Sequence, residues 1–430
     1  MLRTLQALVA LACFAACASH HSVEPAPDAP ASSIDSAIDS AVDAAGLTGP
    51  FANVPRDGTW TFIPFANAYC ADGSSTGIGV SLTTDSDDLL IYLNGGGACW
   101  DQATCNAATT GSPLGPCATN LSTGYDETHG QPAWSTFADV SSNAGTIYDR
   151  TDPNNPLRTF NFIHIFYCTG DTHAGSTIAS YTTKGRDGQP HPVHHLGYQN
   201  LLLYLDALTG SFHPSRVMLA GGSAGGFGSY TGYAAVANAF SSVPVYMIDD
   251  AGPYMENAYT PAGMAKAALA WNAAAAIPAG CTACTSSGPE GGMAALAPYL
   301  SSAYPQGRMA LVTSTQDAEI RQRYELDGPS YAAALTSLAT NVFDPLPNWR
   351  YFYMAGNTHT ALMGAIAHDT SCGRTITSVT TPPGTVCGQT LQQFIADELG
   401  SQTWTSATPP PGVPGENMKV SDLSRCSLTN

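Results

Sequence analysis

Charged side chains are scarce in this sequence, and basic ones are the scarcest. Charged residues make up 11% of the 430 residues, whereas they make up roughly 25% of an average globular protein. The chain has 15 lysines and arginines against 33 aspartates and glutamates, a formal net charge of −18. Nucleic acids and anionic membrane surfaces require a basic patch on a protein partner. The composition therefore argues against both as partners, while 44% hydrophobic residues suffice for a large core.

The apolar run near the N-terminus, residues 5–16, falls short of the length that spans a bilayer. An early arginine precedes it and small residues stand just before Cys17, which predicts a signal peptide over residues 1–17. Residues 14–17 resemble a bacterial lipobox, in which cleavage precedes Cys17 and the cysteine is lipidated, whereas residues 16–18 fit an ordinary signal-peptidase site. Both alternatives predict an extracytoplasmic protein, either a cell-envelope lipoprotein or a secreted one. A lipid on Cys17 would be its only membrane attachment.

Residues 18–50 lack aromatic residues and a periodic apolar pattern, and are rich in alanine, serine, aspartate and proline. Such a composition cannot bury enough apolar surface to fold by itself. We therefore expect a disordered acidic linker over residues 18–50. The pattern changes near residue 51, and we expect a single folded domain over residues 51–430.

Twelve cysteines are present, and ten remain once the two in the predicted signal peptide are set aside. An even number in an exported chain favours disulfides that staple its loops. Cys99 and Cys105 are close enough in sequence for a local bridge. Cys281 and Cys284 form a single CxxC without the second pair that a structural zinc site needs or the thioredoxin-like context of a redox site. We interpret them as structural half-cystines, and a redox or metal role is the alternative.

Strand-like and helix-like segments alternate after residue 51, which indicates layered α/β architecture. Several strand-like runs are almost continuously apolar, as expected for a parallel sheet buried on both faces. One helix is predicted by apolar residues at 201, 204, 205 and 208, with Gly210 as its stop. We expect a mostly parallel central sheet flanked by helices. The predicted strands are residues 88–94, 160–168, 216–220, 243–249, 309–314 and 349–354.

The sequence GGSAG at residues 221–225 fits the G-x-S-x-G pattern, with Ser223 between glycines. In that pattern a strand turns sharply into a helix and presents the serine at the bend. The apolar strand before it and the predicted helix over residues 224–240 supply this context. A plain turn that happens to contain serine is the alternative.

A nucleophilic serine needs a base, and the base needs an acid that orients it. His359 follows one predicted strand and Asp317 another, in the chain order serine, acid, histidine. Asp250 follows a third strand and is a rival for the acid, and spacing alone does not decide between them. A helix N-cap is the alternative role for Asp317, and an ordinary loop residue is the alternative for His359.

Acyl transfer also needs N–H donors for the developing oxyanion. A second glycine turn, residues 95–97, follows a predicted strand, and the amides of Gly96 and Gly97 together with that of Ala224 are candidate donors. A tight turn clipped by a Cys99 disulfide is the alternative. No lysine or arginine follows the glycines, which argues against a phosphate-binding loop.

Two histidine-containing segments are candidates for other roles. Asp171 and His173 lie in a loop after a strand and, with Trp100, are candidate substrate-pocket residues; a purely structural turn is the alternative. Histidines 191, 194 and 195 cluster, but Pro192 breaks a helical face and no carboxylate is in register. We therefore predict no metal site.

These ordered motifs resemble the pectin acetylesterase/Notum family of serine esterases, in a bacterial, lipoprotein-like form, over about residues 55–400. The resemblance implies an α/β-hydrolase-like fold, Ser223 as nucleophile, and Asp317 rather than Asp250 as acid. It likewise implies His359 as base, with residues 96, 97 and 224 as oxyanion donors. The chain departs from the family at Ala98, where plant members usually have Trp, and at Ala251, where many members have Ser. The matching segments are residues 69–81, 89–100, 161–176, 194–205, 216–230, 248–254, 313–319 and 356–361.

The sequence thus predicts a serine carboxylesterase that removes small acyl groups, most simply acetyl, from a carbohydrate such as acetylated pectin. Its partner would be an acylated carbohydrate or another small ester, and we expect a monomer that needs no metal or organic cofactor. Two alternatives stay open. One is a lipid or protein-lipid deacylase, and the other is a carbohydrate-binding envelope lipoprotein without turnover.

Overall fold

The computed structural model describes residues 47–106, 117–118, 121, 143–288, 291–374, 387–400 and 403–409. The predicted signal peptide, Cys17 and residues 18–46 of the predicted linker lie outside this set. Within it, no helix combines the length and the apolar character needed to cross a membrane. Thr48, inside the predicted linker, donates a hydrogen bond from its hydroxyl to the Gly210 carbonyl, and Phe51 is fully buried.

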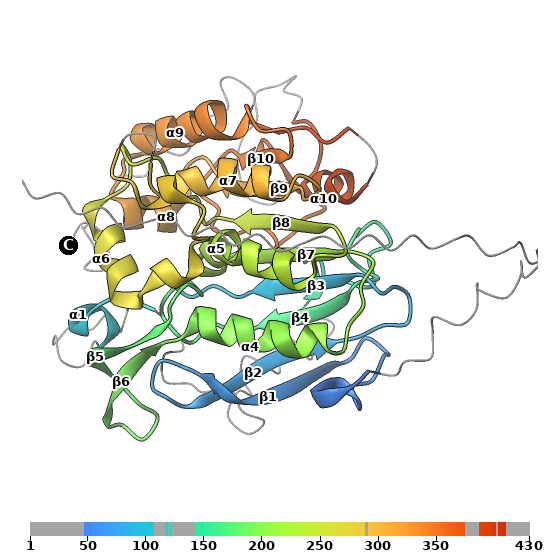
Figure 1. Ribbon diagram of the computed structural model, residues 1–430. Coiled ribbons are helices and arrows are strands. Elements are labelled where there is room, and N and C mark those ends of the chain that lie inside the picture. The colour runs from blue at the N-terminus through green and yellow to red at the C-terminus, as the bar shows by residue number, and fades with distance from the viewer. Residues whose placement is uncertain are drawn as a thin grey trace, which may run out of the picture. The chain divides into compact units, whose positions relative to one another are not determined.

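The core of the described chain is an eight-stranded sheet in the order β1-β2-β4-β3-β7-β8-β9-β10 (Figure 1). β1 and β2 are antiparallel to each other, β2 is antiparallel to β4, and every pair from β4 to β10 is parallel. This confirms the mostly parallel sheet expected from sequence. Its strands are β1 (Trp60–Tyr69), β2 (Ser75–Ser81), β3 (Leu89–Leu93), β4 (Asn161–Ile165), β7 (Val217–Gly222), β8 (Val245–Asp250), β9 (Met309–Ser314) and β10 (Trp349–Met354).

Apolar side chains of each parallel strand alternate between two cores, one on each face of the sheet. In β3, Leu89, Ile91 and Leu93 enter the larger core, whereas Leu90 and Tyr92 enter the smaller one. Burial of both faces explains why these strands read as continuous apolar runs. The six strands predicted from sequence are β3, β4, β7, β8, β9 and β10.

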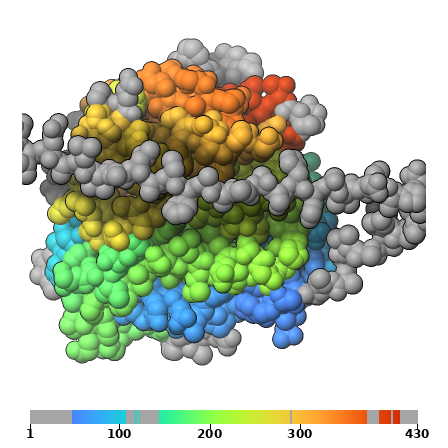
Figure 2. Space-filling model, in the orientation of Figure 1, coloured from blue at the N-terminus to red at the C-terminus, as the bar shows by residue number. Residues whose placement is uncertain are grey.

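Helices cover both faces of the sheet. Helices α4, α5, α7 and α9 pack in the larger core and α10 in the smaller one. Helix α4 contacts β1, and the space-filling view shows the two side by side on one face of the molecule (Figure 2). The α-helices are α1 (Gln102–Cys105), α4 (Gly197–Thr209), α5 (Ala224–Ala239), α6 (Ala262–Trp271), α7 (Leu296–Ala303), α8 (Ala318–Tyr324), α9 (Gly328–Ser337) and α10 (Leu391–Leu399).

Smaller elements complete the described chain. Strands β5 (Thr177–Lys184) and β6 (Pro190–His195) form an antiparallel hairpin, and β11 (Asp369–Thr370) pairs with β12 (Gly373–Arg374). The π-helical turn η6 (Leu338–Phe343) continues α9. The 3-10 turns are η1 (Gly49–Phe51), η3 (Ala273–Ala276), η4 (Thr282–Thr285) and η5 (Met293–Ala295).

Four disulfides join described cysteines. Cys99–Cys105 is the local bridge expected from spacing, and Cys281–Cys284 joins the two cysteines of the CxxC in a disulfide. Cys372–Cys387 closes a short loop, whereas Cys70–Cys168 joins residues 98 positions apart, at the ends of β1 and of the segment after β4.

The carboxyl ends of β3, β7, β8, β9 and β10 meet at one edge of the sheet, because these strands are parallel and in register. Asp250 is the last residue of β8, and the segments that follow β3, β7, β9 and β10 carry, in turn, the glycine turn, Ser223, Asp317 and His359. Topology therefore gathers at this edge the residues that the sequence analysis singled out, although up to 136 positions separate hydrogen-bonded members of the group.

Candidate active site

Ser223 lies at a sharp turn between β7 and α5. Its φ of 57° and ψ of −118° are strained for a residue with a side chain, and this strain is typical of a serine raised on a strand-to-helix bend. The Ser223 N–H donates to the Asp250 carbonyl at 2.7 Å. A Cβ on Gly225 would lie 1.9 Å from the Leu93 carbonyl oxygen, so only glycine lets α5 approach β3 this closely.

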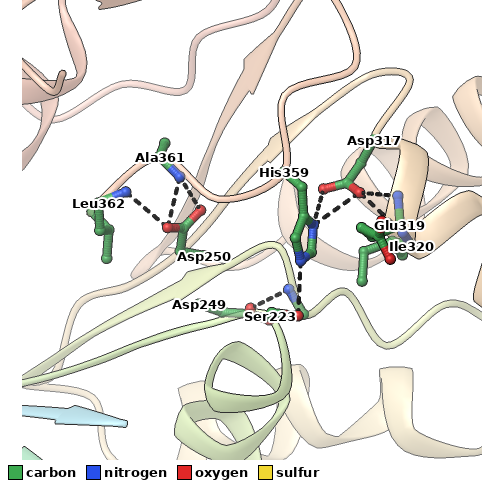
Figure 3. Close-up of polar contacts among 10 residues, drawn as sticks. Ser223, Asp249, Asp250, Asp317, Glu319, Ile320, His359, Ala361 and Leu362 are labelled. Atoms are coloured by element: carbon green, nitrogen blue, oxygen red, sulfur yellow. Dashed lines mark hydrogen bonds and ion pairs between the residues drawn. The ribbon is translucent and has the colours of Figure 1, made fainter. Parts of the chain in front are cut away.

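His359 lies in the loop after β10 and contacts both Ser223 and Asp317 (Figure 3). Its Nε2 is 2.8 Å from the Ser223 Oγ, and its Nδ1 is 2.9 Å from Oδ2 and 3.0 Å from Oδ1 of Asp317. The structure therefore brings the three predicted side chains into one hydrogen-bonded row. The carboxylate end of the row is fully buried, and the imidazole is partly exposed.

Asp317 is also the N-cap of α8, the alternative role that the sequence left open for it. Its Oδ1 accepts the N–H groups of Glu319 and Ile320, both at 3.0 Å. The two roles coexist, because one carboxylate can accept bonds from the helix start and from the imidazole. The cap fixes the orientation in which the carboxylate faces His359.

Asp250, the rival acid, is buried and faces the His359 loop from the other side (Figure 3). Its carboxylate accepts the N–H of Ala361 at 2.8 and 3.0 Å and the N–H of Leu362 at 2.8 Å. Among the described residues it makes no hydrogen bond to the His359 ring. Asp250 thus binds the backbone that follows His359, and Asp317 binds the imidazole.

The charges around the His359 imidazole oppose the effect of burial on its pKa. Burial lowers the pKa of His359, but the hydrogen bond and charge of Asp317, with the charges of Asp250 and Glu319, raise that pKa above its ordinary 6.5. Burial also raises the pKa of Asp250 to about 7, although the N–H groups of Leu362 and Ala361 oppose the shift.

The glycine turn after β3 presents backbone N–H groups beside Ser223. Gly97 has a φ of 78°, and a Cβ there would lie 2.3 Å from the Cys117 carbonyl oxygen. The peptide after Gly97 is fixed on both sides, since the Tyr167 hydroxyl donates to the Gly97 carbonyl and the Ala98 N–H donates to Cys117. In the described part of the chain, the Gly97 N–H has no acceptor.

Ala224 is the first residue of α5, so its N–H has no partner within the helix. The three predicted oxyanion donors, residues 96, 97 and 224, line the same cavity as Ser223 and His359. The arrangement can therefore supply amide donors to an oxygen that develops charge next to the serine.

A cavity of about 710 Å³ opens beside the Ser223–His359 pair. Apolar and aromatic side chains dominate its wall, and its lining residues also include one acidic side chain, Glu319, and two basic ones, Arg323 and His359. Trp100, one of the candidate pocket residues, is among the lining residues. Helix α6 adds two residues that sequence reasoning missed, because nothing in the chain around 264 and 271 indicates which face of that helix reaches the site. The main apolar residues of the wall are Trp100, Phe227, Tyr254, Met264, Trp271, Ile320, Tyr324 and Met363.

Asp171 and His173, the other candidate pocket residues, do not line this cavity but lie behind its wall. Asp171 is fully buried and accepts hydrogen bonds from the Thr169 hydroxyl at 2.6 Å and the Gly197 N–H at 2.8 Å. The His173 Nε2 lies 2.8 Å from the Asn94 carbonyl oxygen, next to the glycine turn. Their side chains make these internal hydrogen bonds, as in the structural turn that the sequence analysis left as the alternative, and contact with substrate stays a prediction.

Burial shifts the pKa values of Asp171 and His173 in opposite directions. It raises the pKa of Asp171 to about 6 and lowers the pKa of His173 to about 4. Ala98 and Ala251, the two positions at which the chain departs from the family pattern, lie in different places. Ala98 lines the cavity, whereas Ala251 is buried in the larger core.

Histidines 191, 194 and 195 all lie in strand β6 of the β5–β6 hairpin. His195 lies 2.8 Å from the Tyr181 hydroxyl and 2.9 Å from the Thr169 carbonyl oxygen, and His191 pairs with Asp187 at 3.0 Å. In the described ranges, the one group with metal-ligand spacing joins His195 to the Cys99–Cys105 sulfurs. Those sulfurs form a disulfide and are not thiolate ligands.

Comparisons with known proteins agree with this architecture. The family model described as Pectinacetylesterase matches residues 56–283, more than half of the chain. Two crystal forms of the Wnt deacylase Notum from Drosophila are similar in fold. One has 18% identity, a TM-score of 0.52, and coverage of 73% of this chain and 88% of Notum; the other has 19% identity, a TM-score of 0.51, and coverage of 72% and 88%. A search of curated protein sequences found no match.

Proposed function

The chain belongs to the pectinacetylesterase family, and from that premise we propose that it is an exported serine carboxylesterase that removes small acyl groups, most simply acetyl, from a carbohydrate such as acetylated pectin. The observation that carries the proposal is the row from the Ser223 Oγ through His359 to Asp317, with 2.8 and 2.9 Å between successive members. This row opens into a cavity whose wall includes residues 96, 97 and 224, the candidate amide donors.

In the proposed first half-reaction, the Ser223 Oγ attacks the ester carbonyl carbon while His359 Nε2 takes its proton. Asp317 keeps the other proton on Nδ1 and stabilises the imidazolium that forms. The amides of residues 96, 97 and 224 stabilise the oxyanion of the tetrahedral intermediate. The intermediate collapses, the alcohol leaves with the proton from Nε2, and the acyl group remains on the serine.

The second half-reaction repeats these roles with water. His359 takes a proton from a water molecule, which attacks the acyl-enzyme carbonyl. The second tetrahedral intermediate forms in the same place and is stabilised by the same amides. The Ser223 oxygen then leaves with the proton from Nε2, and the carboxylic acid is released.

A second candidate function, removal of longer acyl chains from a lipid or a lipid-modified protein, is favoured by the cavity itself. Its volume of about 710 Å³ exceeds what an acetyl group occupies, and its wall includes Trp100, Phe227, Met264 and Trp271. Burying an acyl chain against such a wall yields about 0.8 kcal/mol for each CH₂. An acyl-length series therefore separates the two candidates.

The proposed location is extracytoplasmic, as a lipoprotein anchored at Cys17 or as a secreted protein. Four disulfides among the described residues support it, since disulfides persist in oxidising compartments. The proposed enzyme acts as a monomer.

Hydrolysis of p-nitrophenyl esters, from acetyl to palmitoyl, tests the proposal. We expect turnover by the wild type and loss of about 10⁶-fold in kcat for Ser223→Ala. Ser229→Ala is the matched control, because Ser229 lies in the same helix and its hydroxyl donates to the Gly226 carbonyl. Equal rates for wild type and Ser223→Ala would refute the serine mechanism, and binding of acetylated glycan without any turnover would favour the non-catalytic alternative.

The acyl preference decides between the two substrates. A maximum at acetyl, with acetate release from acetylated pectin, supports the carbohydrate esterase. A maximum at longer chains supports the lipid deacylase and contradicts the carbohydrate proposal.

A further inference from the structure

We propose that Asp250 is a positioning residue that holds the backbone of the nucleophile and the backbone after the base of the proposed esterase in fixed positions relative to each other, and whose negative charge helps to shift the acid limb of the activity to higher pH. The inference rests on the proposed function. It assigns Asp250 a role that differs from that of the acid Asp317 and that requires no contact with substrate.

Asp250 ends β8, between the strand that leads to Ser223 and the strands that lead to Asp317 and His359. Its carbonyl oxygen accepts the Ser223 N–H at 2.7 Å. Its carboxylate accepts the N–H groups of Ala361 and Leu362, each at 2.8 Å. One residue therefore fixes the backbone of the nucleophile and the backbone two and three positions after the base.

Both attachment points lie beside strained backbone. Ser223 has a φ of 57°, and Thr360, between His359 and the first bound N–H, has a φ of 61°. Such conformations persist only where surrounding contacts determine them. The loop that carries His359 is neither helix nor strand at this point, and the hydrogen bonds to the buried carboxylate restrain it together with the Ile147 N–H, which donates to the Leu362 carbonyl at 3.0 Å. The bonds to the carboxylate are charge-assisted, which makes them stronger than bonds between neutral groups.

The charge of Asp250 acts on the same imidazole. Four titratable groups face it: His359 and Asp317 from the loops after β10 and β9, Tyr92 from β3, and Asp249 from its own strand. The charge of Asp250 is one of the influences that raise the pKa of His359. Protonation of Asp250, whose pKa burial raises to about 7, would remove both this charge and part of its capacity to accept the two N–H groups.

A purely structural anchor and a positioning residue predict different results. If Asp250 only supports the fold, its loss lowers the amount of active enzyme and leaves the pH profile unchanged. If it positions His359, its loss lowers kcat with little change in KM. The reason is that the hydrogen-bonded row of Ser223, His359 and Asp317 is disturbed, whereas the cavity that would bind the substrate is not. If its charge acts on the imidazole, its loss also moves the acid limb of kcat/KM to lower pH.

The test uses Asp250→Asn and Asp250→Ala, with p-nitrophenyl acetate as substrate and pH profiles measured on the full chain. Asp250→Ala is expected to lose about 10²-fold in kcat, the cost of a small misplacement of a catalytic group. Asp250→Asn keeps an oxygen that can accept the two N–H groups and should recover part of that loss. Both variants should shift the acid limb to lower pH, since both lack the charge.

Asp249→Asn is the matched control. Asp249 precedes Asp250, is equally buried, and accepts the Gly252 N–H at 2.7 Å instead of an N–H of the His359 loop. It should retain the wild-type profile. Thermal unfolding and near-UV circular dichroism establish that each variant is folded, and if Asp250→Ala is not, the isosteric Asp250→Asn decides.

Two outcomes would overturn the inference while leaving the esterase intact. One is wild-type kcat in Asp250→Ala; the other is a loss of rate in Asp250→Asn without any shift of the acid limb. A failure of the proposed function has a different signature, because the wild type itself would then show no turnover that depends on Ser223.

Discussion

Asp317 meets His359 through both of its carboxylate oxygens, at 2.9 and 3.0 Å from Nδ1, although 42 positions separate the two residues in sequence. The same carboxylate caps α8, so the start of a helix holds it in place. Asp317 therefore has two roles, one in the proposed chemistry at His359 and one as the N-cap of α8. A change that removes the charge but keeps the cap should therefore separate catalysis from folding.

Asp317→Asn is that change. Asparagine caps a helix about as well as aspartate, so we expect little change in Tm. Its amide can offer the imidazole a donor where the carboxylate offered an acceptor, which favours the wrong tautomer of His359, and kcat should fall by about 10⁴-fold. The measurement is kcat for p-nitrophenyl acetate together with Tm.

Asp327→Asn is the control for this prediction. Asp327 caps α9 through the Ser330 N–H at 2.8 Å and does not line the cavity. It should keep the wild-type kcat. A loss of activity as large in Asp327→Asn as in Asp317→Asn would show that capping, and not the contact with His359, is responsible.

The pH dependence of the proposed esterase follows from the raised pKa of His359. The imidazole must be neutral to accept the Ser223 proton, so activity is lost as pH falls through that pKa. Because Asp317, Asp250 and Glu319 together raise it above 6.5 against the effect of burial, the acid limb of kcat/KM should have its midpoint above pH 6.5.

Glu319→Gln offers a simple check, because it removes one of these charges at the exposed rim of the cavity. The midpoint should move to lower pH while the plateau changes little. A wild-type midpoint below 6.5 would contradict the assignment of the limb to His359 in this environment.

Sequence reasoning found the parallel strands but missed the antiparallel ones. The parallel strands are buried on both faces and therefore read as apolar runs. β2 contains glycines instead of a continuous apolar run. A Cβ on Gly77 would lie 2.1 Å from the Ile63 carbonyl oxygen of β1. This close approach depends on the pairing of β1 with β2, so the sequence of either segment alone does not reveal it. The β5–β6 hairpin was missed because prolines and histidines dominate β6.

The sequence also placed candidate site residues after the correct strands but did not choose between the two acids. Asp250 ends β8 and Asp317 follows β9, and these adjacent parallel strands reach the same edge of the sheet. Which carboxylate meets the ring and which meets the backbone depends on the paths of the loops around His359. Loop paths follow from tertiary packing, for which local sequence carries no period or cap signal.

The disulfides should differ widely in what they contribute to stability. In the chain-entropy model a disulfide stabilises more when it closes a longer loop. Cys70–Cys168 closes a separation of 98 residues, and Cys281–Cys284 closes one of three. Replacing the first pair by serines should lower the free energy of unfolding by about 2–5 kcal/mol, and replacing the second pair should lower it much less.

Urea unfolding of the two double variants measures this difference, and each serves as the control for the other. Both remove two cysteines, so a general effect of lost sulfur atoms would lower stability equally. Equal losses would contradict the loop-length argument for this chain.

Glu398 in α10 should make the protein less stable as pH rises. It is fully buried. Burial raises the pKa of Glu398 well above its ordinary 4.5, against the charge of Arg308. The folded state therefore binds this proton more tightly than the unfolded state. The stabilisation is complete below pH 4.5 and is lost as pH rises through the folded-state pKa, at about 1.4 kcal/mol per pH unit.

Glu398→Gln removes the titration while keeping the shape of the side chain. We expect its stability to fall less steeply than that of the wild type above pH 4.5, so that the variant is the more stable protein at alkaline pH. Thermal unfolding across a pH series measures both slopes. Asp397→Asn is the control, because Asp397 is the adjacent residue and is only half-buried, and it should retain the wild-type slope. Parallel curves for wild type and Glu398→Gln would mean that Glu398 ionises in the folded protein as readily as in the unfolded chain.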